Sequence, residues 1–178
     1  MKTPSVLAIL TAVFLLAAGP AAWADTVPSD KGIAAVNHLI ERHTDAEKGF
    51  KDAAANVNEA DLRDDLLKKS EERRAYREEL QAAVARLGEK YEKGGGSLEG
   101  AAYRAWIDVK AFVTDENNVA VLNAVRTGEE DAVESFKDVL GEPLNDELRK
   151  TVQKQFKGVL SSYNWIVDEI KNRTKAEA

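Results

Sequence analysis

The 178-residue chain has no cysteine, two histidines and four prolines. Without cysteine it can form no disulfide, iron–sulfur cluster or thiolate zinc site. Its formal charge of −6 at pH 7 disfavours nucleic acid and anionic membrane surfaces as partners. It also has no alternating apolar pattern long enough to indicate a β-strand. The sequence therefore predicts an acidic, all-α protein.

One long apolar run is present, near the N-terminus. Lys2 precedes apolar residues 6–18, and Gly19-Pro20 and then Ala22-Trp23-Ala24 follow. The run is short for a membrane span, and the small-x-small triplet is typical of a signal-peptidase site. An uncleaved membrane anchor is the competing interpretation. The domains expected are a signal peptide at residues 1–24, a polar lead at 25–30 and a helical domain at 31–178, which would be periplasmic or secreted and free of the membrane after cleavage.

Four long stretches carry apolar residues in alternating steps of three and four, the spacing of one face of a helix. They predict helices over about 31–56, from a cap at Asn58 to Leu87, around 122–139, and from a cap at Asn145 to about 170. A shorter helix is expected at 98–113, within the connection between the second and third long helices.

That connection, from about Gly88 to Asn117, is long enough to run back along the bundle. Such a crossover would let the third long helix run parallel to the second, as in ferritin-like bundles. The predicted fold is a ferritin-like four-helix bundle with a short additional helix in the crossover connection. An open five-helix up-and-down bundle is the alternative.

Each stripe is interrupted near its middle by a residue that can ionise or form hydrogen bonds. His43 and Arg73 each lie 15 residues from Asn58, in the first turn, so they should face each other. Glu129 and Gln155 lie at similar distances from the turn of the second hairpin. Buried polar groups need partners. The predicted core polar layer comprises His43, Glu47, Lys69, Arg73, Glu129 and Gln155.

A metal site is one interpretation of this layer. Ferritin-like di-iron proteins supply a Glu from each of two helices and a Glu-x-x-His pair from each of the others. Here Glu72 is followed three residues later by Ala75, and Gln155 by Gly158, so both pairs are missing, and Arg73 adds a positive charge. The residues left to hold iron or manganese would be Glu47, Glu129 and His43.

The interpretation we favour is structural, with no cofactor and no catalytic residue. Arg73 would neutralise Glu47 or Glu129, while His43 and Gln155 would complete a hydrogen-bonded network that sets the helix register. A small-ligand carrier has little support, because Leu, Val and Phe fill most stripe positions.

Several short motifs occur in order along the chain: Asn37-His38-Leu39-Ile40-Glu41, Asp45-Ala46-Glu47-Lys48-Gly49-Phe50, Gly96-Ser97-Leu98-Glu99-Gly100, Arg104-Ala105-Trp106 and Gly128-Glu129-Glu130-Asp131-Ala132. Together they resemble a bacterial ferritin-like four-helix-bundle family of unassigned function, over nearly all of residues 31–170. The resemblance implies a ferritin-like bundle with Glu47 and Glu129 facing inward, and it supplies no activity. The signal peptide is a departure from relatives that resemble cytoplasmic proteins.

The function predicted is that of an exported, non-enzymatic protein of the bacterial cell envelope with a structural, interaction or stress-related role. Its partner would be another protein or a second copy of the chain. The alternative is a degenerate ferritin-like metal-binding or oxidase-like protein that uses the core carboxylates.

Overall fold

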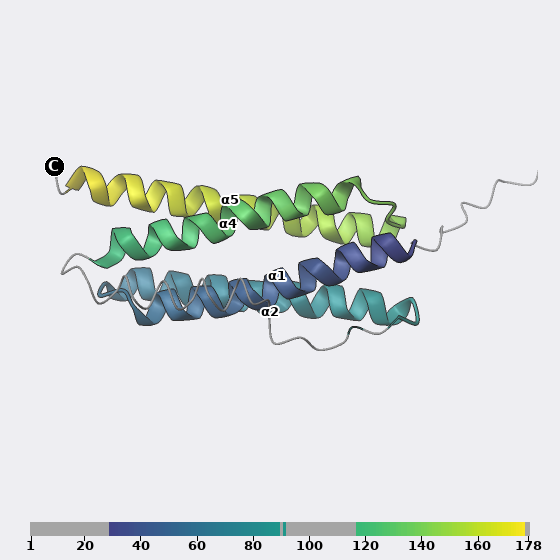
Figure 1. The fold of residues 1–178 in the computed structure, drawn as a ribbon. Coiled ribbons are helices and arrows are strands. Elements are labelled where there is room, and N and C mark those ends of the chain that lie inside the picture. The colour runs from purple at the N-terminus through teal and green to yellow at the C-terminus, as the bar shows by residue number, and fades with distance from the viewer. Residues whose placement is uncertain (1–28, 90, 92–116, 177–178) are drawn as a thin grey trace, which may run out of the picture.

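The computed structural model describes residues 29–89, 91 and 117–176, which form four α-helices and no strand (Figure 1). The helices are α1 (Asp30–Ala55), α2 (Ala60–Arg86), α4 (Asn117–Gly141) and α5 (Asp146–Ala176). The predictions of an all-α protein and of four long helices are confirmed. The expected signal peptide and the expected short helix at 98–113 lie outside the described residues.

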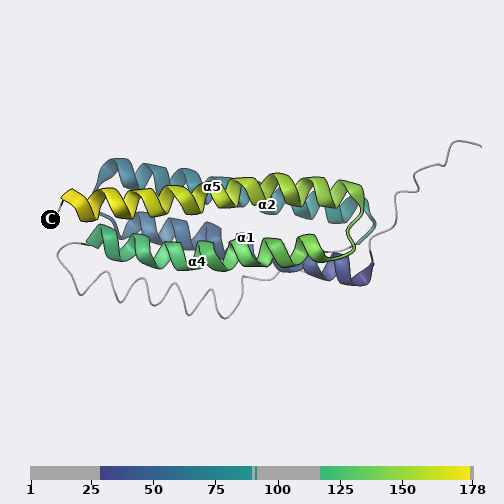
Figure 2. The same ribbon diagram turned by 90° about the horizontal axis from the view of Figure 1, so that it is seen from above.

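The four helices form a bundle in which α1 packs against α2 and α4, and α5 packs against α4 and α2 (Figures 1 and 2). The pairs α1/α5 and α2/α4 therefore lie on the two diagonals. The start of α1 approaches the turn after α4, because a Cβ added to Gly32 would lie 2.6 Å from the Pro143 carbonyl oxygen. At the other end, Arg173 of α5 forms an ion pair with Glu59, just before α2. Adjacent helices are thus antiparallel, and α2 and α4 run in the same direction.

Three of the predicted helix ends are clear in the structure. The Ser29 hydroxyl accepts a hydrogen bond from the Gly32 N–H at 3.1 Å and caps α1. The Asn145 side chain accepts from the Leu148 N–H at 2.8 Å, so its predicted role as the cap of α5 is confirmed. After α2, Gly88 adopts a φ of +80°, a conformation that glycine tolerates best.

The prediction that Asn58 caps α2 is wrong. The cap residue is Glu59, whose side chain makes no capping hydrogen bond. The Asn58 N–H instead donates to Asn118 Oδ1 at 3.1 Å, and Asn118 Nδ2 donates to Glu59 Oε1 at 2.6 Å. A contact with the first turn of α4 therefore organises this turn, which local sequence signals could not indicate.

The core consists of two apolar clusters, one toward each end of the bundle. The cluster near the α4–α5 turn includes Leu39, Leu80, Phe136 and Val152, and the cluster near the α1–α2 turn includes Phe50, Leu66, Leu122 and Ile166. Four of the six predicted polar residues, His43, Arg73, Glu129 and Gln155, are buried at the level between the two clusters. None of the described helices combines the length and apolar character that crossing a membrane requires.

Candidate functional site

Four buried polar side chains, one from each helix, form what we call the polar layer. They are His43 from α1, Arg73 from α2, Glu129 from α4 and Gln155 from α5, and none is more than 2% exposed. The side chains pair along the diagonals of the bundle: His43 with Gln155, and Arg73 with Glu129. Each pair joins two helices that do not otherwise pack together.

The α1–α5 pair fixes the orientation of both side chains. The amide nitrogen of Gln155 donates to the Tyr76 carbonyl at 3.1 Å and to the Glu79 carboxylate at 2.9 Å. Both of these groups accept, so the Gln155 amide oxygen must face His43, 3.1 Å away. His43 therefore carries its proton on Nε2 and donates it to Gln155.

His43 is held in its neutral form. The centre of its ring lies 5.5 Å from that of Tyr76 and 5.5 Å from that of Phe136. Burial first, and then the positive charge of Arg73, lower the pKa of His43 from 6.5 to about 3. At neutral pH this histidine is therefore a hydrogen-bond donor without charge.

The α2–α4 pair is a buried ion pair. Arg73 Nη2 lies 2.5 Å from Glu129 Oε2, and the guanidinium carbon lies 5.7 Å from the centre of the Phe50 ring and 5.8 Å from that of Tyr76. Arg73 Nε and Nη1 have no hydrogen-bond partner among the described residues. Burial raises the pKa of the Glu129 carboxyl more than the Arg73 charge lowers it. The pair thus combines a strong attraction with a high cost of desolvation.

Glu47 and Lys69 lie outside the polar layer, although the sequence stripes place them in it. Glu47 forms an ion pair with Arg77, and Lys69 lies 3.3 Å from Glu72, with 24% and 23% of the two side chains exposed. Ser70 occupies the buried face of α2 instead, and its hydroxyl donates to the Glu47 carbonyl at 2.8 Å. Because the apolar stripe of α2 advances in steps of three or four residues, either Lys69 or Ser70 could face inward. The packing of the helices places Ser70 on the buried face.

The helix register also shows which residues spaced by three face inward on α2, and they are members of the apolar stripe rather than Glu72 and Ala75. Ala75 is exposed, so the pair spaced by three on α2 is Arg73 and Tyr76. The Tyr76 hydroxyl donates to Glu72 at 2.7 Å, and burial followed by this bond raises the pKa of Tyr76 to about 12. A Cβ added to Gly158 on α5 would lie 2.0 Å from that hydroxyl. Tyr76 therefore fills the space that Gly158 leaves, and this mid-helix glycine was the available sequence signal.

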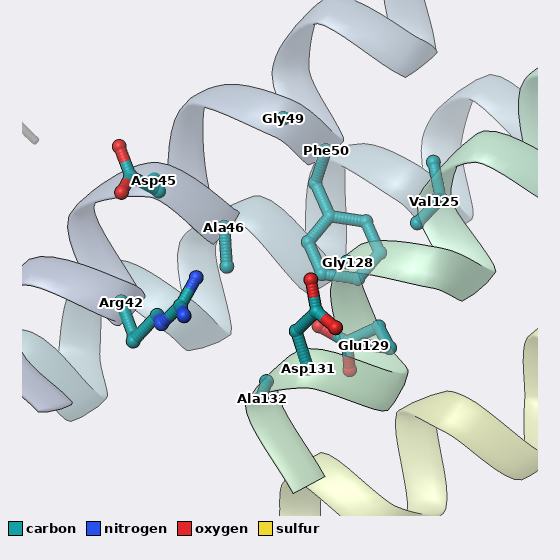
Figure 3. Close-up of a pocket in the computed structure, with 10 residues that line it drawn as sticks. All are labelled: Arg42, Asp45, Ala46, Gly49, Phe50, Val125, Gly128, Glu129, Asp131 and Ala132. Atoms are coloured by element: carbon teal, nitrogen blue, oxygen red, sulfur yellow. The ribbon is translucent and has the colours of Figure 1, made fainter. Parts of the chain in front are cut away.

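A pocket of about 320 Å³ lies between α1 and α4 (Figure 3). Its α1 side is lined by Arg42, Asp45, Ala46, Gly49 and Phe50, and its α4 side by Val125, Gly128, Glu129, Asp131 and Ala132. Glu129 thus belongs both to the polar layer and to the wall of the pocket. The stripes did not predict this pocket, because it depends on the open space beside Gly49 and on how the helices pack.

The residues considered for a metal site do not come together as a ligand set. Among the described residues, no group of three or more histidine, aspartate or glutamate side chains is arranged to hold a metal ion. Each candidate ligand has another partner: Glu47 pairs with Arg77, Glu129 with Arg73, and His43 with Gln155.

Residues 31–142, more than half of the chain, match the family described as "Domain of unknown function (DUF2383)". The matched region includes α1, α2 and α4 and reaches the turn before α5. The match confirms that the chain resembles a family of unassigned function. No curated protein is found to match the chain.

Proposed function

We propose that this chain, which belongs to the DUF2383 family, is an exported, non-enzymatic ferritin-like bundle with a structural or interaction role in the bacterial cell envelope. The observation that carries the proposal is the Arg73–Glu129 ion pair, which occupies the middle of the bundle. In ferritin-like di-iron proteins the metal ligands project into this region.

The directions of the helices support the ferritin-like assignment. Two antiparallel hairpins, α1–α2 and α4–α5, pack so that α2 and α4 run in the same direction. A four-helix bundle with one long crossover between its second and third long helices has this arrangement.

The polar layer does not fit a di-iron or di-manganese centre. Such a centre needs a glutamate from each of two helices and a Glu-x-x-His pair from each of the others. The inward-facing pairs here are Arg73 with Tyr76, and Gln155 with Gly158, while His43 occupies the layer on α1. Glu129 is the one carboxylate of the layer, and the guanidinium of Arg73 holds it. A permanent cation at this level opposes the binding of metal cations.

The layer instead suits a structural role. Each of its two pairs joins two helices that lie diagonally opposite in the bundle. Together the pairs fix the positions of all four helices along the bundle axis. Buried polar pairs specify register in this way in other helical assemblies. A bundle with a fixed register presents a constant outer surface to a protein partner or to a second copy of itself.

Metal analysis of the purified protein tests the non-enzymatic part of the proposal. We expect substoichiometric iron and manganese by mass spectrometry, and no oxidation of iron(II) above the buffer rate in air. About two metal ions per chain, lost on Glu47→Ala or Glu129→Ala substitution, would reject it and favour the metal-binding alternative.

Export is tested separately, in cells. The run at residues 6–18 and the Ala22-Trp23-Ala24 triplet predict a mature chain that begins at Asp25. N-terminal sequencing of the protein from the periplasm or medium should find this start. Recovery of the intact chain from Met1 in the membrane fraction would contradict export with cleavage.

A further inference from the structure

The pocket between α1 and α4 has the size and lining of a small-molecule site. Its volume is about 320 Å³. An apolar cavity of roughly 150 Å³ holds a benzene molecule, and ligand pockets begin at roughly 300 Å³. Its apolar wall consists of Ala46 and Phe50 from α1 and Val125 and Ala132 from α4 (Figure 3). One or two rings would fit this space.

A glycine keeps the pocket open. Gly49 lies in the interior of α1, where glycine destabilises a helix relative to alanine. No close contact requires glycine there, because a Cβ added to Gly49 would have no atom within 4 Å. Gly128 lines the same pocket from the interior of α4. The side chain missing at Gly49 leaves space that no described residue fills.

The pocket has charged side chains as well as an apolar wall: Arg42, Asp45 and Asp131 line it, and the buried carboxylate of Glu129 gives it a further polar contact point. Glu129 is 2% exposed and lines the pocket. Its Oε2 accepts a hydrogen bond from Arg73, which leaves Oε1 as the other acceptor of the carboxylate. Because Arg73 already balances the charge, a ligand need not be a cation. A neutral N–H or O–H would satisfy the remaining oxygen.

We propose that this pocket binds a small, neutral, mainly apolar molecule of one or two rings, whose N–H or O–H donates to Glu129. The rings would occupy the space beside Gly49 and pack against Phe50. This ligand site goes beyond the proposed structural role and does not depend on it, since a bundle in either the cell envelope or the cytoplasm could contain it.

Indole and benzofuran form a matched pair of probes, because they have nearly the same shape and only indole carries an N–H. Both are titrated into the ¹⁵N-labelled protein and followed by two-dimensional NMR. We expect indole to bind with a Kd below about 1 mM, which is within the range for nine non-hydrogen atoms. Benzofuran should bind at least about tenfold more weakly, since it cannot donate to a charged acceptor.

Two leucine substitutions on α1 test the location. Gly49→Leu should fill the pocket and weaken indole binding at least about tenfold, while helix content by circular dichroism is retained, because the new Cβ meets nothing within 4 Å. Ala34→Leu, at an exposed position on the same helix, is the matched control and should leave indole binding unchanged. The indole-induced shifts should concentrate in residues 45–50 and 125–132.

Three results would overturn the proposal. The first is an absence of saturable indole binding up to about 10 mM, well above the expected Kd. The second is equal affinity for benzofuran and indole, which would exclude a hydrogen bond to Glu129. The third is unchanged indole binding by a folded Gly49→Leu variant, which would place the ligand elsewhere.

Discussion

Two grooves of the bundle each contain a glycine in the middle of a helix, and the two glycines have opposite effects on packing. Between α2 and α5, Gly158 makes room for Tyr76, whose hydroxyl would lie 2.0 Å from an added Cβ. Between α1 and α4, Gly49 has open space in front of it and lines a pocket. The same sequence signal therefore marks close packing in one groove and a cavity in the other, and the side chains of the facing helix make the difference.

Arg73 connects the two grooves. Its guanidinium lies at similar distances from Phe50, which lines the open groove, and Tyr76, which fills the closed one. The polar layer therefore contacts residues of both grooves. Substitutions within the layer should change the free energy of unfolding more than substitutions at either glycine.

The largest effect is expected for Arg73→Ala. Removal of the guanidinium leaves Glu129 buried without a counter-charge, which should lower the free energy of unfolding by about 3–5 kcal/mol. Chemical denaturation at pH 7 measures this loss. The double variant Arg73→Met, Glu129→Leu removes both charges and should recover most of the stability. A loss of only a few tenths of a kcal/mol for Arg73→Ala would show that the pair is solvated.

Gly158→Ala should destabilise the closed groove. The added methyl group would overlap Tyr76, and overpacking of this kind costs about 1–3 kcal/mol. Adding Tyr76→Phe removes the nearest atom, so the loss caused by Gly158→Ala should be smaller in that background. A double-mutant cycle by denaturation measures the coupling. Additive effects would mean that Tyr76 does not restrict residue 158.

The pH dependence of stability should reveal neutral His43. Below pH 6.5 the unfolded chain protonates this histidine, whereas the folded chain resists protonation down to about pH 3, so stability falls as the pH falls. Between pH 7 and pH 5 this contribution is about 2 kcal/mol.

The variant His43→Gln isolates that contribution. The raised pKa of Glu129 acts in the opposite sense, but Glu129 is present in both proteins and its effect largely cancels in the difference. Wild type should lose about 2 kcal/mol more than the variant between pH 7 and pH 5. Parallel stability curves would show that His43 is already solvated in the folded state.

The smallest effect, with the opposite sign, is expected for Gly49→Ala. Alanine has a higher helix propensity, and its Cβ would meet no atom within 4 Å, so the substitution should stabilise the protein by about 1 kcal/mol. Thermal unfolding measures the gain, with Gly158→Ala as the matched comparison. Destabilisation by Gly49→Ala would mean that Gly49, like Gly158, is closely packed against the facing helix.

Much of the fold was predictable from the spacing of apolar residues. The stripes indicated the four long helices, and Asn145 and Gly88 marked two of their ends. The spacing also brought His43, Arg73, Glu129 and Gln155 to one level, because helices rise by a constant amount per residue from a shared turn. These features depend on local periodicity and chain distance, which a sequence contains directly.

The sequence by itself thus determined the helices and the level of the polar residues. Only the tertiary structure decided which partners meet: Arg73 with Glu129 rather than Glu47, Ser70 rather than Lys69 on the buried face, and Asn58 with Asn118 rather than as a cap. It also decided that Tyr76 fills one groove while the other stays open. The reason is that the rotation of each helix about its axis, and the pairing across the diagonals, depend on how all four helices pack together. A stripe with steps of three and four leaves the rotation of a helix undetermined by about one residue.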